Sequence, residues 1–329
     1  MEEKSRQFVE KGAQIYAKVG YNFILFLMAI NWKDALLSSG VPLEYSVRRI
    51  LESLDIADAR EYKYLRPNEN GIETQFSIDL RATHINFKTN HWLELFIECK
   101  YRKDGTSWIF APDTFSELST SPFSSTFVHL DLFSDSGQVN EEVVDKFAHN
   151  YTACSKGVEL TDAGCNPKSI AQALSQLKYG LVDNFVDCIL HQVDHLLGDN
   201  SPIFSHAAFV VTTADLWRLK EGVTISDIRA AKDLQDVATN HDLLFCFEPP
   251  DNELQRYAEQ KFRSSFTTKQ IEWMDRVAVA RGGHSFQHYT DVLARSYPCY
   301  FAIIGLPRLH ATLARTMDFF SQEGVFLKR

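Results

Sequence analysis

The sequence lacks an apolar run long enough to cross a bilayer. The apolar stretch at residues 21–30, YNFILFLMAI, has ten residues, whereas a membrane-spanning helix needs about 20. Residues 1–12, MEEKSRQFVEKG, are charged and contain no apolar signal-peptide region. We therefore expect no membrane partner, and we expect residues 21–30 to form a helix of the hydrophobic core.

Cysteine pairs and nucleotide-binding loops are also missing. The six cysteines never form a CxxC pair, and their spacing resembles neither a disulfide framework nor a zinc ribbon. This usage predicts a reduced, cytoplasmic compartment. No GxxxxGK[ST] motif is present, so no phosphate loop is expected. His284 and His288 have helical i, i+4 spacing, but without a surrounding HExxH motif a chance pair explains them better than a metal site.

An excess of positive charge is absent as well. The chain has 34 Lys and Arg residues against 43 Asp and Glu residues, which gives a net charge of −9. This balance argues against a protein that coats nucleic acid, although a local basic patch can still steer a nucleic acid to one place. Basic side chains gather in two stretches, and the second fits a phosphate-binding surface less well than the solvated face of a helix. The two stretches are Arg81, Lys100, Arg102 and Lys103, and then Arg256, Lys261, Arg263, Lys269, Arg276 and Arg281, interleaved with Tyr257, Phe262 and Trp273.

The residues that are present suffice for a sizeable core in a mixed α/β fold. The 329 residues are 45% hydrophobic and 23% charged, as in ordinary globular proteins. Helical periodicity alternates along the chain with short strand-like runs. We expect helices at 3–38, 43–54, 168–195, between 213 and 243, across most of 251–295 and at 308–322, a turn at 40–42 and a loop at 112–126. We expect strands at 62–65, 75–82, 92–100, 107–111, 127–133, 207–213, 243–247 and 300–306.

Two of the expected strands bring charged residues together. Side chains alternate across a strand, so in 75–82 the residues Phe76, Ile78, Leu80 and Ala82 are expected on one face and Asp79 on the other. In 92–100 the residues Glu98 and Lys100 share the face opposite Leu93, Leu95, Ile97 and Cys99. An antiparallel hairpin through 84–91 that matches the two apolar faces would place Asp79 beside Glu98 and Lys100.

Such a group of side chains suits a divalent cation. Two carboxylates close together on a sheet repel each other, and a cation between them removes the repulsion, with oxygen ligands that suit Mg²⁺. A neighbouring lysine can position an attacking water or stabilise charge on a phosphate. The alternative is an exposed ladder of salt bridges on a half-solvated sheet.

The pattern of Asp79, an 18-residue gap and then Glu98-Cys99-Lys100 resembles the PD-(D/E)xK nuclease superfamily. The ECK tripeptide is especially similar to Mrr-type restriction enzymes and Holliday-junction resolvases, while Ile78 stands at the place of the family's proline. The resemblance covers roughly residues 40–215. It implies an αβββαβ core of the restriction-endonuclease type, a mixed central sheet flanked by helices.

The resemblance also implies roles for these residues. Asp79 and Glu98 would bind Mg²⁺, with Mn²⁺ as a substitute, the backbone carbonyl of Cys99 would add a ligand, and Lys100 would assist the attacking water. Family members often add a glutamate from the preceding helix. Helical phase favours Glu44 over Glu52 for this position, although a surface position for Glu44 remains the alternative.

Some members of the superfamily use a glutamine on the helix after the lysine strand. Gln172 and Gln176 are candidates, and both also fit solvated positions, because they lie away from the apolar face of that helix.

The sequence thus predicts three regions and one activity. The regions are a helical N-terminal segment at 1–40, a nuclease-like core at 41–215 with an insertion near 112–165, and an α/β extension at 216–329 packed on the core. The resemblance implies Mg²⁺-dependent phosphodiester hydrolysis, with DNA as the favoured substrate, in restriction, repair or anti-phage defence. A second copy of the chain or a defence-system protein is a further expected partner. The alternatives are a nuclease-fold protein that binds or assembles without catalysis, and an unrelated α/β protein with an accidental match.

Overall fold

The computed structural model describes residues 32–68, 70–113, 128–130, 152–195, 202–280 and 284–321. The chain divides into two compact units, Met1–Pro42 and Leu43–Arg329. Within the first unit, helix α2 spans Trp32–Ser38 and has no buried residue. The core helix expected at 21–30 and nearly all of the loop expected at 112–126 lie outside the described residues. None of the described helices is long and apolar enough to cross a membrane.

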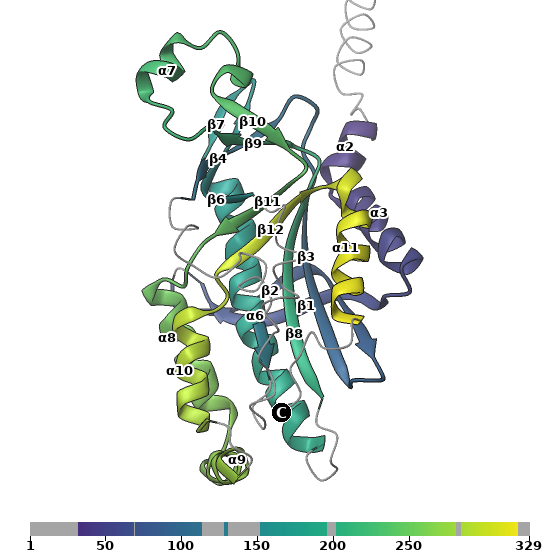
Figure 1. Cartoon of the computed structure of the whole chain (residues 1–329), viewed down its shortest axis with the longest axis vertical. Coiled ribbons are helices and arrows are strands. Elements are labelled where there is room, and N and C mark those ends of the chain that lie inside the picture. Colours follow the sequence, from purple (N-terminus) through teal and green to yellow (C-terminus); the bar gives the residue numbers. More distant parts are fainter. Residues whose placement is uncertain are drawn as a thin grey trace, which may run out of the picture. The chain divides into compact units, whose positions relative to one another are not determined.

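A mixed sheet organises the second unit (Figure 1). Its described part has 12 strands, ten of them in the order β1-β2-β3-β8-β12-β11-β6-β4-β9-β10, while β5 pairs with β8 and β7 with β6. Strand β8 runs parallel to both β3 and β12, so strands from either side of residue 216 share this sheet. The strands are β1 Ala57–Pro67, β2 Glu73–Asn86, β3 His91–Lys100, β4 Ser107–Pro112, β5 Val128–Leu130, β6 Ala153–Thr161, β7 Gly164–Asn166, β8 Ile203–Thr212, β9 Asp215–Leu219, β10 Ala238–His241, β11 Leu243–Phe247 and β12 Tyr300–Gly305.

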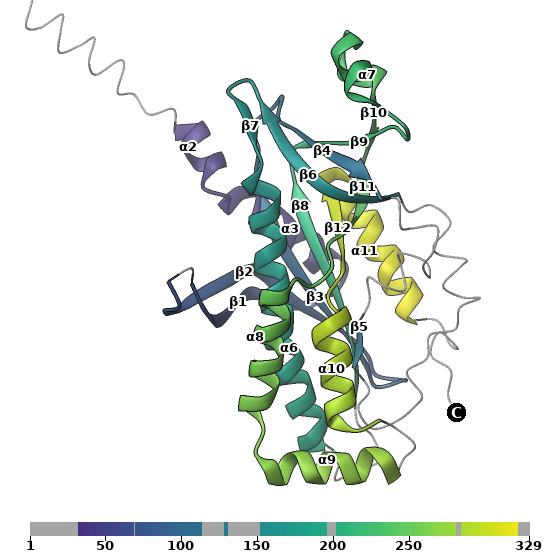
Figure 2. The same ribbon diagram turned by 90° about the vertical axis from the view of Figure 1, so that its left-hand side faces the viewer.

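Helices cover both faces of this sheet (Figures 1 and 2). On one face, α6 packs against β1, β2, β3, β6 and β8, and α8 and α10 pack beside it. On the other face lie the buried residues of α3 and α11. The helices are α3 Val41–Ser53, α6 Lys168–His195, α7 Ile225–Ala230, α8 Asn252–Ser265, α9 Thr268–Ala280, α10 Phe286–Ser296 and α11 Leu306–Ser321, with a short 3₁₀ helix, η2, at Leu234–Asp236.

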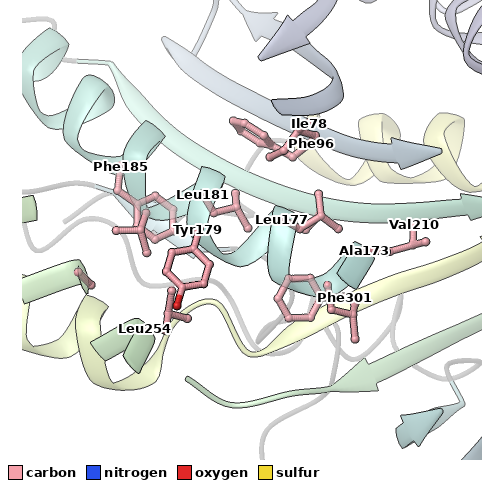
Figure 3. Close-up of a cluster of buried hydrophobic side chains, with 14 of the residues drawn as sticks. Ile78, Phe96, Ala173, Leu177, Tyr179, Leu181, Phe185, Val210, Leu254 and Phe301 are labelled. Carbon is pink, nitrogen blue, oxygen red and sulfur yellow. The ribbon is translucent and has the colours of Figure 1, made fainter. Parts of the chain in front are cut away.

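Each face of the sheet has its own hydrophobic core. The α6-side core joins side chains of α6 to Ile78, Phe96, Val210 and Phe301 of the sheet, as Figure 3 shows. The other core joins α3 and α11 to alternate residues of β2, β3, β8 and β12. These central strands are apolar on both faces, as expected of strands covered by helices on both sides.

Most of the expected elements are present, including α6 and β11 with the predicted bounds. Helix α3 begins at Val41 instead of Leu43, because a proline fits the first helical turn, where no intrahelical N–H bond is lost. The helical stretch expected between 213 and 243 is present only as the short helices α7 and η2, since β9 and β10 occupy the ends of that stretch. Strand β6 was not expected. Its Gly157 weakens the sequence signal, yet a Cβ there would lie 2.4 Å from Cε1 of Phe110, so the packing requires glycine.

The expected alternation along β2 is wrong at one point. Ile78 packs into the α6-side core, whereas Leu80 packs into the opposite core. Between β1 and β2, Tyr62 pairs with Ile78 but Arg60 pairs with Arg81, so β2 contains one extra residue there. This irregularity is a β-bulge, which bends the strand and re-aims its side chains. Asp79 lies in it. The hairpin from β2 to β3 is antiparallel, as predicted.

Candidate functional site

At the bulge, the carboxylate of Asp79 accepts a hydrogen bond in place of a backbone carbonyl of β2. Its Oδ2 accepts a hydrogen bond of 2.7 Å from the backbone N–H of Cys99, while the ladder between β2 and β3 begins only at Leu80 and Ile97. The N–H and C=O of one strand residue point toward the same neighbouring strand. The carbonyl of Cys99 therefore also points to the side of Asp79, away from β8.

The carboxylate of Glu98 is deeply buried, with 1% of the residue exposed. Its Oε1 accepts a hydrogen bond of 2.5 Å from Nζ of Lys100. Its Oε2 is buried and accepts no hydrogen bond from any described residue. Burial, and then the charge of Asp79, raise the pKa of Glu98 to about 7, against the opposing effects of Lys100 and of the backbone N–H of Asp79. Burial also raises the pKa of Asp79. Both carboxylates are thus poorly compensated when ionised.

Lys100 lies two residues from Glu98 on the same face of β3, as the E-x-K spacing predicts. Its Nζ also donates to Oε1 of Gln176 at 3.2 Å, and Nε2 of Gln176 donates to the backbone oxygen of Ser77 at 3.2 Å. The hydroxyl of Tyr64 donates to the backbone oxygen of Gln176 at 3.0 Å. Gln176, one of the two predicted glutamines, therefore joins the site, whereas Gln172 is exposed on the same helix.

A glycine allows α6 to approach β2 closely enough for this contact. A Cβ on Gly180 would lie 2.3 Å from Cδ1 of Ile78 and 3.2 Å from Cε1 of Tyr64. Gly180 is one helical turn beyond Gln176. The close approach that the missing side chain allows therefore also brings the Gln176 amide near β2. The sequence shows the glycine but not the close approach that requires it.

Glu44 on α3 faces the same cluster. It is half-buried, and burial followed by the negative charge of Asp79 raises its pKa. Glu52 is instead exposed and forms an ion pair of 2.9 Å with Arg49. Glu44, the glutamate that the helical phase favours, is thus close enough to Asp79 for its charge to affect the pKa of Glu44.

Glu61 on β1 is a carboxylate near the site that the sequence did not indicate. It lies opposite the bulge, between the residues that pair with Ile78 and Arg81. Its negative charge contributes to raising the pKa of both Asp79 and Glu44. Its own side chain is half exposed and contacts Lys63 at 3.3 Å. Only knowledge of the bulge would have revealed this placement.

The donor set suits an open cation site. Among the described residues, no group of three or more His, Cys, Asp and Glu side chains lies close enough to hold a metal ion. A closed structural metal centre is therefore not formed by this part of the chain. Mg²⁺, however, usually keeps several waters and takes only one or two carboxylates. Asp79, the unbonded Oε2 of Glu98 and the carbonyl of Cys99 fit that requirement.

Several of the other predicted charged residues contact groups outside this cluster. Arg81 contacts the buried Glu94 at 2.7 Å, and Arg102 pairs with Glu159. In the second basic stretch, Lys261 pairs with Asp183, Arg256 and Arg276 bond to carbonyls of their own helices, and Arg281 lies outside the described residues. The rings of His284 and His288 are 4.5 Å apart, and both residues are exposed.

No protein-family model matches the chain, and no curated protein or solved structure matches it. The function is therefore argued from the side chains of the site and from the order of the elements that hold them.

The raised pKa of Glu98 predicts a pH-dependent stability. Because its pKa in the folded state exceeds the ordinary value of 4.5, Glu98 contributes stability that is present below about pH 4.5 and is lost as the pH rises through about 7. Glu98→Gln removes this loss. In chelator, its free energy of unfolding relative to wild type should rise by on the order of 1–3 kcal/mol from about pH 5 to about pH 8.

Denaturant titrations at a series of pH values measure this difference. Glu52→Gln, an exposed change of the same charge, is the control and should follow the wild-type curve. If the free energies of unfolding of wild type and Glu98→Gln depend on pH in the same way, burial does not raise the pKa of Glu98.

Proposed function

We propose that this chain is a Mg²⁺-dependent nuclease of the PD-(D/E)xK type, with Mn²⁺ as a substitute cation and DNA as the favoured substrate. The observation that carries the proposal is the buried Glu98, whose Oε2 has no donor among the described residues and which lies beside Asp79 with Lys100 bonded to its other oxygen. A cytoplasmic role in restriction, repair or anti-phage defence, alone or with a partner protein, belongs to the same proposal.

The order of elements supports this choice of fold type. Helix α3 is followed by β1, β2 and β3, which form consecutive antiparallel pairs, and then by α6 and β8, which runs parallel to β3. With β4 to β7 regarded as an insertion, this order follows αβββαβ. The carboxylates and the lysine come from the second and third strands of that unit, as the resemblance requires.

Each residue of the site would have its own role in the reaction. A bound Mg²⁺ supplies a Lewis acid for the phosphate and a water of lowered pKa. Asp79, Glu98 and the carbonyl of Cys99 would hold it. Lys100 has three N–H donors, of which two contact Glu98 and Gln176. The third can bond to the attacking water or to a phosphate oxygen, where it stabilises the charge that develops in the transition state.

One observation favours a second function, a nuclease-fold module that binds without cleaving. The described residues include no group of three or more His, Cys, Asp and Glu side chains that could hold a metal ion, and Lys100 already neutralises Glu98 at 2.5 Å. A permanent ion pair of this kind could serve stability alone. A metal titration separates the two functions, because the binding module needs no cation at Glu98.

The proposal predicts that Lys100→Ala and Asp79→Ala fail in different ways. Lys100→Ala should lose about 10²–10³ in cleavage rate, as for other removed transition-state donors, while most cation affinity and folding remain. Asp79→Ala should lose cation affinity together with activity, because Asp79 supplies ligand oxygens. Cleavage of DNA and RNA substrates with Mg²⁺ or Mn²⁺, calorimetry and melting temperature measure these effects.

Lys103→Ala, an exposed lysine three residues further along the chain, is the matched control and should cleave at the wild-type rate. Wild-type activity in Lys100→Ala would show that the E-x-K match is accidental. A wild-type protein that binds no cation and cleaves no nucleic acid would favour the binding module.

The glutamine contact predicts a second, smaller effect. Gln176→Leu removes the hydrogen bonds to Lys100 and to Ser77, so Lys100 loses its fixed direction. Loss of such an orienting contact typically costs about 10–100-fold in activity. Gln172→Leu, an exposed change of the same chemistry on the same helix, should have almost no effect. Turnover rates that fall equally in both variants would exclude a positioning role for Gln176.

A further inference from the structure

Arg66 on β1 holds its guanidinium between two aromatic rings. The guanidinium carbon lies 4.2 Å from the ring centroid of Phe76 on β2 and 4.1 Å from that of Tyr179 on α6. Phe76 in turn stacks on Tyr64 with the ring centroids 6.1 Å apart. A guanidinium between two rings is held in one plane, so little of its freedom is left to lose when it binds a ligand.

Within the described part of the chain, Arg66 has no acidic partner. Among the described residues, the side chain of Arg66 forms no ion pair within 4.0 Å and no hydrogen bond, and its Nε is buried without an acceptor. Arg81, Arg102 and Arg218 each contact a glutamate instead. Arg66 is therefore not placed to neutralise an internal acid, and an unpaired buried guanidinium nitrogen calls for an explanation.

The two rings belong to the segments that build the candidate active site. Phe76 lies three residues before Asp79 on β2, and Tyr179 lies three residues after Gln176 on α6. Three strand residues span about 10 Å. At about 3.4 Å of axial rise per nucleotide along one strand, this corresponds to about three nucleotides.

We propose that Arg66 binds a backbone phosphate of the nucleic-acid substrate, about three nucleotides from the cleaved bond. The inference rests on the proposed nuclease function. The planar fork of an arginine matches the oxygens of a phosphate, and aromatic stacking leaves the edge of the guanidinium for such a contact.

Two nearby acids bear on this inference. After the larger effect of burial, the negative charges of Glu253 and Asp251 raise the pKa of Tyr179, against the opposing effect of Arg66. Neither acid forms an ion pair with Arg66 within 4.0 Å, so both lower the local positive potential without occupying the guanidinium.

Binding without cleavage provides the test. In the full-length Lys100→Ala protein, fluorescence anisotropy measures the affinity for a duplex and a single-stranded DNA between about 50 and 200 mM salt. Arg66→Gln should weaken binding by about tenfold and reduce the slope of log affinity against log salt by about 0.9 for the duplex, the value of one phosphate contact. Arg66→Lys should keep most of the slope.

Arg60→Gln is the matched control, since Arg60 is an exposed arginine of the same strand that contacts Asp58 at 3.8 Å. It should leave affinity and slope unchanged. With Lys100 restored, Arg66→Gln should raise KM and leave kcat nearly unchanged, because it removes binding that is equal in the ground and transition states.

The outcomes separate this inference from the proposed function. A reduced slope in Arg66→Gln supports a phosphate contact by Arg66 even if the wild type cleaves nothing, in which case the catalytic proposal and the distance to a cleaved bond fail. An unchanged slope and KM in an active enzyme would overturn the inference and leave the nuclease proposal intact. A lower melting temperature with an unchanged slope would show that Arg66 only joins β1 to α6. The inference would also be overturned if Arg60→Gln reduced the affinity and the slope as much as Arg66→Gln does. It would likewise be overturned if the Lys100→Ala protein bound no DNA.

Discussion

Burial of the Glu98 carboxylate beside Asp79 is the constraint on which the rest of the site depends. Burial and then the charge of Asp79 raise the pKa of Glu98, so the two carboxylates cost stability when both are ionised. The one cation in hydrogen-bonding contact with Glu98, among the described residues, is Lys100, and it reaches a single oxygen. A structure that served stability alone would gain from an apolar residue at this position. We therefore propose that a ligand outside the polypeptide completes the site, and a divalent cation would match the charge and the oxygen donors.

The backbone around Asp79 and Glu98 also helps to place the side chains of the site. The bulge in β2 turns Asp79 toward the N–H of Cys99, which frees the edge of β3 from a regular ladder at that point. On the opposite side, the missing side chain of Gly180 lets α6 approach so that Gln176 can bond to Lys100. Bulges and glycine contacts of this kind are common next to functional sites, because they direct side chains that a regular sheet could not direct.

The sequence predicts what depends on periodicity and not what depends on irregular contacts. Helix α6 and strand β11 have strong patterns and were predicted with their bounds, and the E-x-K spacing placed Glu98 and Lys100 on one face. The bulge at Asp79 was not predictable, since it is a mismatch between two strands and leaves no pattern within either one. Strand β6 was missed because Gly157 weakens its pattern, and Glu61 was missed because its place follows from the bulge.

The account's central claim concerns where a divalent cation binds. Diffraction from crystals grown or soaked with Mn²⁺, measured at an energy where manganese scatters anomalously, locates the ion without reference to activity. We expect one strong peak with oxygens of Asp79 and Glu98 and the carbonyl of Cys99 at about 2.0–2.3 Å, close to the distances of small divalent cations. Asp79→Asn crystals should lose most of that peak. A manganese peak only at other positions, or none at a concentration that saturates the protein in solution, would contradict the account.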